Sequence, residues 1–255
     1  MENNMKDKRS LGIIGIGQFA EFFIPHIRPY FSEIYIASRS DKSRLAKRLG
    51  VIQAPIETVA AQDSVILAMP ISQITSVLQE IRDHLKEGAI VMDVCSVKVF
   101  PIREMRRILP KSAGILGTHP LFGPQSGKNG IKGLQIVLCP ERMKDKEYSQ
   151  IKKIFMDMGL DVKETSAKRH DEVMAYTQSL THFFSRAAGK IIPFEDFAFT
   201  TPSAKRLKDI IFEVKDDSPQ LFIDMQTFNP YANKVRRQLL KELNMLEKKV
   251  CKKKL

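Results

Sequence analysis

Two short polar segments of the sequence carry residue types that can hold or transfer protons. Residues 93–98 read Asp-Val-Cys-Ser-Val-Lys and combine a carboxylate, a hydroxyl and an amine. Residues 117–127 read Gly-Thr-His-Pro-Leu-Phe-Gly-Pro-Gln-Ser-Gly, and these prolines and glycines are typical of a loop that positions one side chain. His119 can accept a proton near neutral pH. A single histidine in a loop is more often structural than catalytic, so this segment alone leaves both interpretations open.

A glycine-rich turn near the N-terminus predicts a dinucleotide site. Residues 15–20 (Gly-Ile-Gly-Gln-Phe-Ala) fit the pattern G-x-G-x-x-G/A, between an expected strand and an expected helix. Glycines allow a tight turn and a close approach of the backbone to a pyrophosphate, and the helix offers free N–H groups to the phosphates. We expect contacts to the cofactor from Gly15, Ile16, Gly17, Gln18 and Phe19. The alternative is a glycine turn without a ligand.

The residues after the second expected strand bear on the choice of cofactor. An NAD site usually places an acid there to hold the ribose 2′-hydroxyl, but no acid occurs before Asp41. Arg39, flanked by Ser38 and Ser40, suits a 2′-phosphate instead. We therefore expect NADP. NAD stays possible, since Arg39 could be a surface residue and Asp41 the ribose ligand.

The elements that must position these segments alternate in character. Strands are expected at the apolar runs 11–16, 33–38, 64–69, 89–94, 113–117, 134–139 and 160–165, and helices at 18–31, 41–49, 72–85, 99–109 and 147–158. This alternation is typical of a parallel sheet covered on both faces. The third strand ends in Ala68, Met69 and Pro70, which we expect either to form a wall of the cofactor cleft or simply to terminate the strand.

Beyond this alternation the chain reads as helical. The fold class is therefore α/β, with a Rossmann-type parallel-sheet domain at 1–168 and an all-helical domain at 169–255. On the first helix, an apolar stripe is expected at Val173, Thr177, Leu180, Phe184 and Ala187. Gln178, Thr181 and His182 share a polar face at i, i+3 and i+4 and are candidates for substrate contact; for Thr181, a hydrogen bond inside the core is the rival interpretation.

A second apolar stripe near the C-terminus bears on assembly. It consists of Val235, Leu239, Leu243, Leu246 and Val250. A stripe longer than one domain can cover usually meets a symmetric copy, so a homodimer is expected.

Composition excludes several classes of protein. Cys95, Cys139 and Cys251 have neither disulfide nor metal-ligand spacing, so no metal site is expected. The start of the chain is polar, and no apolar run approaches the length of a membrane span, which favours a cytoplasmic protein without a membrane partner. About a third of the net charge of +12 lies in a lysine-rich C-terminal tail, and the rest is scattered without interleaved arginines and aromatics. This pattern favours a small anionic substrate over nucleic acid.

Five segments, in order, resemble the prephenate/arogenate dehydrogenase family of tyrosine biosynthesis. They are residues 15–20, 93–98, 117–127, 178–183 and 222–230. The resemblance implies an NADP-dependent prephenate dehydrogenase that converts prephenate to 4-hydroxyphenylpyruvate by oxidative decarboxylation. It assigns His119 to the proton of the substrate's C4 hydroxyl and Ser96 to holding that geometry. An arogenate dehydrogenase that makes tyrosine directly is the alternative within the family.

The chain departs from the family pattern at 199–209. Many members carry a glycine-rich segment there, followed by an arginine that holds a substrate carboxylate, and those glycines are missing here. The candidates to replace the arginine are Ser203, Lys205, Arg206 and Lys208. The excess of basic residues favours the dianionic keto acid, prephenate, over arogenate.

Two other interpretations lie outside the family. A 3-hydroxyacid dehydrogenase or imine reductase would place a lysine on the first helix of the second domain, where this chain has Gln178 and His182. A non-catalytic NADP-sensing regulator would not need a proton acceptor such as His119.

Overall fold

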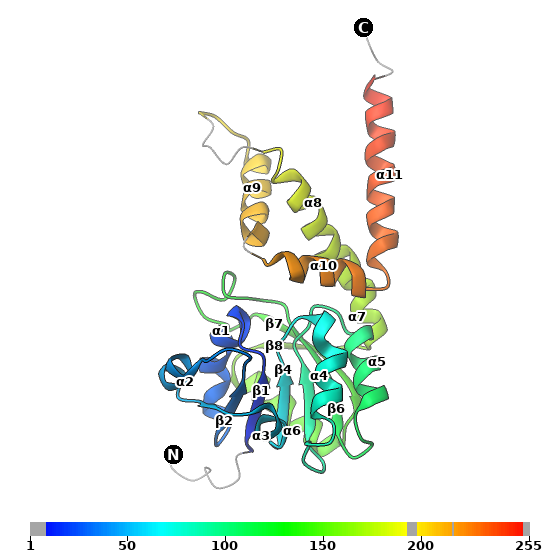
Figure 1. Ribbon diagram of the computed structural model, residues 1–255. Coiled ribbons are helices and arrows are strands. Elements are labelled where there is room, and N and C mark those ends of the chain that lie inside the picture. The colour runs from blue at the N-terminus through cyan, green and yellow to red at the C-terminus, as the bar shows by residue number, and fades with distance from the viewer. Residues whose placement is uncertain (1–8, 193–197, 216, 252–255) are drawn as a thin grey trace. The chain divides into compact units, whose positions relative to one another are not determined.

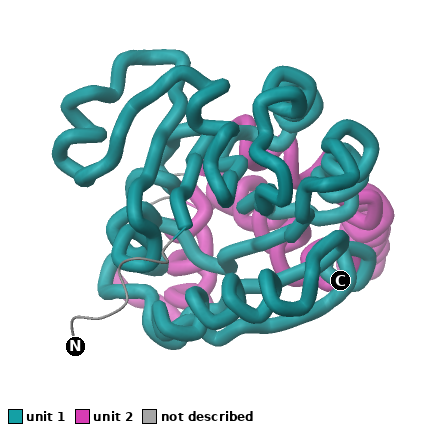
Figure 2. Tube along the Cα trace, turned by 90° about the horizontal axis from the view of Figure 1, so that it is seen from below, with its two compact units in different colours: residues 1–170 teal, residues 171–255 magenta. Residues whose placement is uncertain are grey.

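The computed structural model describes residues 9–192, 198–215 and 217–251. The chain divides into two compact units, residues 1–170 and 171–255, which Figure 2 distinguishes by colour. The first unit contains the sheet, and the described elements of the second unit are helices.

Unit 1 is built on an eight-stranded sheet (Figure 1). The strands are β1 (Leu11–Ile14), β2 (Ile34–Ala37), β3 (Ile52–Gln53), β4 (Ser64–Leu67), β5 (Ile90–Asp93), β6 (Gly114–Pro120), β7 (Gln135–Arg142) and β8 (Asp161–Glu164). Their spatial order is β3-β2-β1-β4-β5-β6-β7-β8. The strand order reverses between β1 and β4, and in such sheets ligands bind beyond the carboxyl ends of the strands at this point. The expected Rossmann-type sheet is confirmed.

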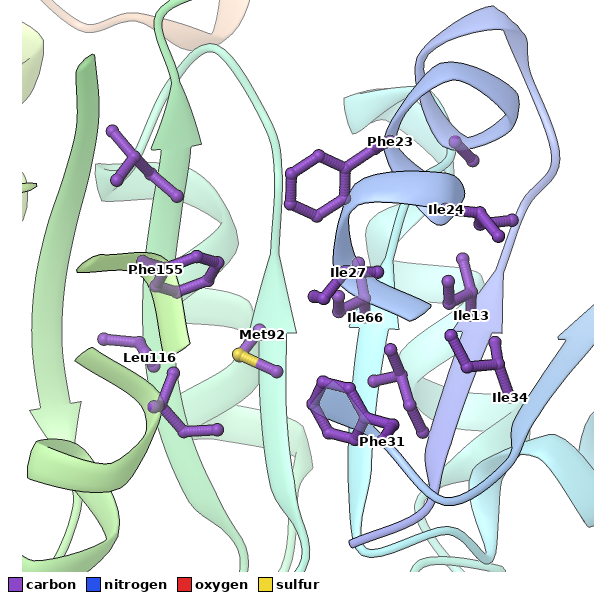
Figure 3. Packing of buried hydrophobic residues seen from close by; sticks show 14 of the residues in the cluster. Ile13, Phe23, Ile24, Ile27, Phe31, Ile34, Ile66, Met92, Leu116 and Phe155 are labelled. Atoms are coloured by element: carbon purple, nitrogen blue, oxygen red, sulfur yellow. The ribbon is translucent and has the colours of Figure 1, made fainter. Parts of the chain in front are cut away.

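Helices cover both faces of this sheet. They are α1 (Gln18–Ile27), α2 (Ser43–Leu49), α3 (Ile56–Ala60), α4 (Ile74–Ile81), α5 (Val99–Ile108) and α6 (Asp145–Asp157). α3 packs on β1 and β2 and contacts α4, which in turn contacts α5. On the other face, side chains of α1 and Phe155 of α6 lie in one apolar layer (Figure 3).

That layer holds α1 in place above the glycine turn. Phe23, Ile24 and Ile27 of α1 are almost completely buried and lie over Ile13 of β1 and Ile66 of β4 (Figure 3). Full burial of each such side chain contributes about 1.5–3 kcal/mol. The N-terminus of α1 is therefore fixed relative to the carboxyl end of β1.

The sheet differs from the expected one at one pair of strands. β6 and β7 pair antiparallel, whereas the other neighbouring strands pair parallel. A parallel neighbour needs a crossover connection, usually a helix, and residues 121–134 contain none. Helix α6 supplies such a crossover between β7 and β8.

Unit 2 follows a helix that crosses the boundary between the units. This helix, α7 (Ala167–Met174), continues through a π-helical turn (Ala175–Ser179) into α8 (Leu180–Ala188). The remaining helices are α9 (Pro202–Lys215), α10 (Pro219–Phe228) and α11 (Ala232–Cys251). Ser218 caps α10, because its Oγ accepts a hydrogen bond of 3.1 Å from the backbone N–H of Leu221. None of the described helices is long and apolar enough to cross a membrane.

The sequence predicts a buried apolar stripe on the first helix of unit 2, and this prediction is wrong. Phe184 is 40% exposed, and Thr177 and Ala187 are also exposed. The buried positions are instead Met174, Ala175, Ser179 and Ser185. A π turn inserts an extra residue into the helical repeat, so a stripe drawn at regular α-helical spacing changes face across it.

The second stripe lies mostly on the surface of the single chain. Val235 is buried, but the exposed fraction along α11 rises from 44% at Leu243 through 58% at Leu246 to 73% at Val250.

Candidate active site

The glycine turn brings the ends of β1 and β4 together. Gly15 has a φ of +96°, a conformation that L side chains rarely adopt. A Cβ on Gly15 would lie 2.7 Å from the carbonyl oxygen of Ala68. Ala68 and Met69, which follow β4, therefore lie against the glycine turn, and this proximity favours a wall of the cofactor cleft over a simple strand terminator.

The first turn of α1 has the features of a phosphate site. Gly17 is the N-cap residue, and no side chain caps the helix. A Cβ on Gly17 would meet no atom within 4 Å, so space lies open beside the turn. Free N–H groups with open space beside them fit a pyrophosphate. The residues present, Gly15 to Phe19, therefore fit the dinucleotide that this fold implies.

The turn after β2 carries both residues that could contact the ribose end of the cofactor, Arg39 and Asp41. Arg39 is exposed. Asp41 is engaged at the start of α2, where its Oδ1 accepts a hydrogen bond of 2.8 Å from the backbone N–H of Ser43. That bond lowers the pKa of the Asp41 carboxyl. Ser38 and Ser40 order the turn between them, because the backbone N–H of Ser40 donates to Ser38 Oγ at 3.3 Å.

A buried ion pair joins the carboxyl ends of β5 and β6. Lys98 donates from Nζ to Asp93 Oδ1 and, at 2.5 Å, to the backbone carbonyl of Thr118. Both charged side chains are fully buried. Burial raises the pKa of the Asp93 carboxyl, and the Lys98 charge opposes that rise. Thr118 Oγ1 returns a hydrogen bond of 2.5 Å to the backbone carbonyl of Asp93, so the two strand ends are held together.

His119 lies one residue beyond this link and is 4% exposed. Its Nδ1 lies 2.9 Å from Nε2 of His170 on α7. Burial, then the nearby His170 and Lys98, hold the pKa of His119 well below its usual value. The imidazole is therefore neutral at physiological pH, the form that accepts a proton.

Ser96, the second predicted catalytic residue, is buried in the turn after β5. Among the described residues, its Oγ has no hydrogen-bond partner. An unpaired buried hydroxyl is costly, so a hydroxyl with this environment is available to a ligand.

The residues predicted to contact the substrate from the helical domain all lie in unit 2. Gln178 is in the π turn, and its Oε1 is buried without a hydrogen-bond partner in the described part of the chain. Thr181 donates to the backbone carbonyl of Thr177 at 3.0 Å, which favours a local structural role. Ser203 is exposed on α9, and Lys208 is half-buried on the same helix.

The pKa of His182 in unit 2 is strongly shifted. Its Nδ1 lies 3.3 Å from Asp217 Oδ2. Burial, and secondarily the charge of Arg186, lower the pKa of His182 to about 4. This histidine is therefore neutral at physiological pH and cannot form a charged pair with Asp217.

Sequence reasoning missed the partners of the site residues. The segment 93–98 was recognised as polar, but not that its two ends form a buried ion pair. His170 lies 51 positions from its partner. No local pattern signals this contact, which arises only when α7 packs beside the end of β6.

The sheet, the glycine turn and the helical unit define a Rossmann-type dinucleotide-binding protein. Residues 27–164 match the family model of the prephenate dehydrogenase nucleotide-binding domain, and residues 166–255 match that of the prephenate dehydrogenase dimerization domain. The chain therefore belongs to the prephenate dehydrogenase family, as the sequence motifs indicated.

Individual relatives agree with this assignment. The chain is 31% identical over 231 residues to arogenate dehydrogenase 2, chloroplastic, of Arabidopsis thaliana, covering 87% of this chain and 64% of the relative. It is 28% identical over 205 residues to a probable arogenate/prephenate dehydrogenase of Methanocaldococcus jannaschii, covering 77% of this chain and 46% of the relative. The chain thus spans about half to two thirds of these relatives.

A solved structure shares the fold. Prephenate dehydrogenase from Aquifex aeolicus, in complex with hydroxyphenyl propionate and NAD+, matches with a TM-score of 0.77 at 22% identity. The match covers 96% of this chain and 91% of that one.

Proposed function

We propose that this chain is an NADP-dependent prephenate dehydrogenase that oxidises and decarboxylates prephenate to 4-hydroxyphenylpyruvate. The observation that carries the proposal is the buried, neutral imidazole of His119, on the sheet edge that also bears the glycine turn. A non-catalytic dinucleotide sensor gains nothing from a proton acceptor there. Family membership supports the same substrate class.

The chemistry assigned to His119 follows from its two ring nitrogens. Nδ1 faces His170, so Nε2 is the nitrogen for a substrate hydroxyl. The bound dinucleotide supplies the hydride acceptor. His119 holds the hydroxyl proton while a carbonyl develops at C4, and returns it to the phenolic oxygen once CO2 has left and the ring is aromatic. Ser96 would position the same hydroxyl through its unpaired Oγ.

We assign NADP as the cofactor on the turn after β2. Both Arg39 and Asp41 are exposed there, but Asp41 Oδ1 already accepts a hydrogen bond from the backbone N–H of Ser43. A guanidinium suits a 2′-phosphate, and a carboxylate that already accepts a backbone hydrogen bond is less available to a ribose hydroxyl. NAD remains the alternative cofactor, and the two cofactors are compared directly in the assay below.

Arogenate is the second candidate substrate, because the Arabidopsis relative is named for it. Prephenate and arogenate differ by one charge at the side-chain end, where we propose contacts from Gln178, His182 and the basic residues of α9. The net charge of +12 favours the more anionic prephenate.

Initial rates with prephenate and arogenate, each with NADP and NAD, test the proposal. The expected outcome is fastest turnover of prephenate with NADP. His119→Asn should lower kcat by about two to four orders of magnitude, since general-base catalysis is lost, while dinucleotide affinity persists. Dinucleotide binding without turnover of either substrate would refute the proposal and favour the sensor. A variant kcat near that of the wild type would refute the role of His119.

We also propose that the chain is a homodimer. The exposed apolar stripe of α11 lies within the segment that matches a dimerization domain. A symmetric copy would bury Leu243, Leu246 and Val250. Sedimentation should give a mass of about 58 kDa, twice that of the chain, and Leu246→Lys should shift it towards the monomer. A wild-type mass of 29.0 kDa would refute the dimer.

A further inference from the structure

We propose that His170 is a positioning residue that holds His119 in the one neutral tautomer able to accept a substrate proton. The inference rests on the proposed function, because that function requires an unprotonated Nε2 on His119. It adds a residue to which no role was assigned from the sequence, and it concerns a contact within unit 1.

The geometry identifies a hydrogen bond between two imidazoles. His119 Nδ1 and His170 Nε2 are 2.9 Å apart, and the ring planes are inclined by 64° with centroids 5.0 Å apart. Both rings are almost completely buried. At this distance the two nitrogens must share one proton, because two bare nitrogens repel and two N–H groups clash.

The shared proton has two possible positions, with opposite consequences. If His119 Nδ1 carries it, the Nε2 of His119 is bare and accepts a hydrogen bond from the substrate hydroxyl. If His170 Nε2 carries it, His119 is protonated on Nε2 and cannot act as an acceptor there. His170 favours catalysis only as the acceptor of the pair.

Charged groups close to the pair show why a histidine at position 170 suits a proton acceptor at position 119. Lys98 lies close enough to lower the pKa of His119, and Asp93 is already paired with Lys98. A carboxylate in place of His170 would orient the ring equally well but would stabilise the imidazolium and raise the pKa of His119. The imidazole of His170 instead orients His119 while it lowers the pKa of that ring.

The position of His170 is itself fixed. Its backbone N–H donates to the carbonyl of Ser166 at 2.9 Å, in the first turn of α7. Ser166 Oγ also accepts a hydrogen bond of 3.2 Å from the backbone N–H of Arg169. The partner ring is thus carried by a capped helical turn, as expected for a group that orients another side chain.

Nitrogen NMR of the ligand-free protein, labelled with [15N]histidine, tests the inference directly. The chain has five histidines, so single substitutions assign the resonances. We expect a pyrrole-type Nδ1 and a pyridine-type Nε2 for His119. His170→Gln should preserve this pattern, because the Gln carbonyl can accept the same proton. His170→Leu should give a mixture of tautomers. The exposed His84→Leu is the control that should change neither the pattern nor the rate.

Kinetics separate positioning from a general loss of structure. His170→Leu should lower kcat by about 10–100-fold, with KM and dinucleotide affinity near those of the wild type. His170→Gln should recover most of that loss. A pyridine-type Nδ1 in wild-type His119, or equal rates for the Leu and Gln variants, would overturn the inference. A wild-type protein that turns over neither substrate would refute the proposed function instead, because the tautomer is measured without substrate.

Discussion

Replacing Lys98 with methionine should destabilise unit 1 strongly, because it leaves the buried Asp93 without its counter-ion. Both side chains are fully buried, and the lysine also donates to the Thr118 carbonyl. Removing one partner of a buried ion pair costs about 3–5 kcal/mol. This loss is a large share of a typical domain stability of about 5–15 kcal/mol.

Two further variants test whether the loss of stability comes from the unpaired buried charge and not from the Lys→Met change itself. Lys86→Met makes the same chemical change in a surface pair, where Lys86 Nζ lies 2.5 Å from Asp63 Oδ1 and the lysine side chain is 59% exposed. It should cost less than about 1 kcal/mol. Combining Asp93→Asn with Lys98→Met removes both charges and should recover most of the loss, since no uncompensated charge remains.

The deficit of the Lys98→Met variant should also depend on pH. Burial raises the pKa of Asp93 in the folded state, and removal of Lys98 raises it further. A carboxyl with a raised folded pKa favours folding at low pH and opposes it as pH rises. The difference from wild type should therefore be smaller at pH 5 than at pH 8.

Hydrogen-exchange mass spectrometry in urea is the appropriate assay, because two compact units need not unfold together. Peptides that cover β5 and β6 report on unit 1 alone. If Lys98→Met costs no more than Lys86→Met in these peptides, the reasoning from the buried pair is refuted.

Two further predictions concern the cofactor and the helical unit. Arg39→Ala should weaken NADP binding by about 10–100-fold, the loss of one charge-assisted contact, and leave NAD binding nearly unchanged; equal losses in titrations with both cofactors would refute the phosphate role. His182 has a folded pKa of about 4 against 6.5 when unperturbed, so the unfolded chain binds the proton first, and stability falls as pH drops below 6.5. Between pH 7 and pH 5 this group should cost unit 2 about 2 kcal/mol, measured by urea unfolding. His182→Gln should lose that share of the pH dependence, and an unchanged dependence would contradict the assignment.

Much of unit 1 could be predicted because its signals are local. A fully buried parallel strand is a continuous apolar run, and β1, β4 and β5 stand out for that reason. β3 has only two residues, too few for any periodicity. The antiparallel pairing of β7 was missed because the segments were assigned by composition, and the direction of a strand depends on its connection.

The candidate site divides in the same way. Gly15 could be recognised from the sequence because a backbone with positive φ favours glycine at that position. His119 could be found through its motif, although the expected loop is wrong at this position because His119 lies within β6. The partners of His119 and Asp93 depend on tertiary packing, as does the π turn that moves the expected stripe of unit 2 to another face. These contacts and the π turn cannot be predicted from the spacing of residues along the chain.

Two buried pairs of side chains lie at the ends of β5 and β6, and the charge of one pair affects the protonation of the other. The carboxylate of Asp93 is paired with Lys98, and the imidazole of His119 faces a second imidazole. If Asp93 faced His119 instead, it would raise the pKa of the histidine and favour a cation, which cannot accept a proton. Lys98 pairs with the carboxylate of Asp93, and the charge of Lys98 also lowers the pKa of His119. If His119 is the proton acceptor that we propose, the buried ion pair supports this role because it helps to keep the imidazole neutral.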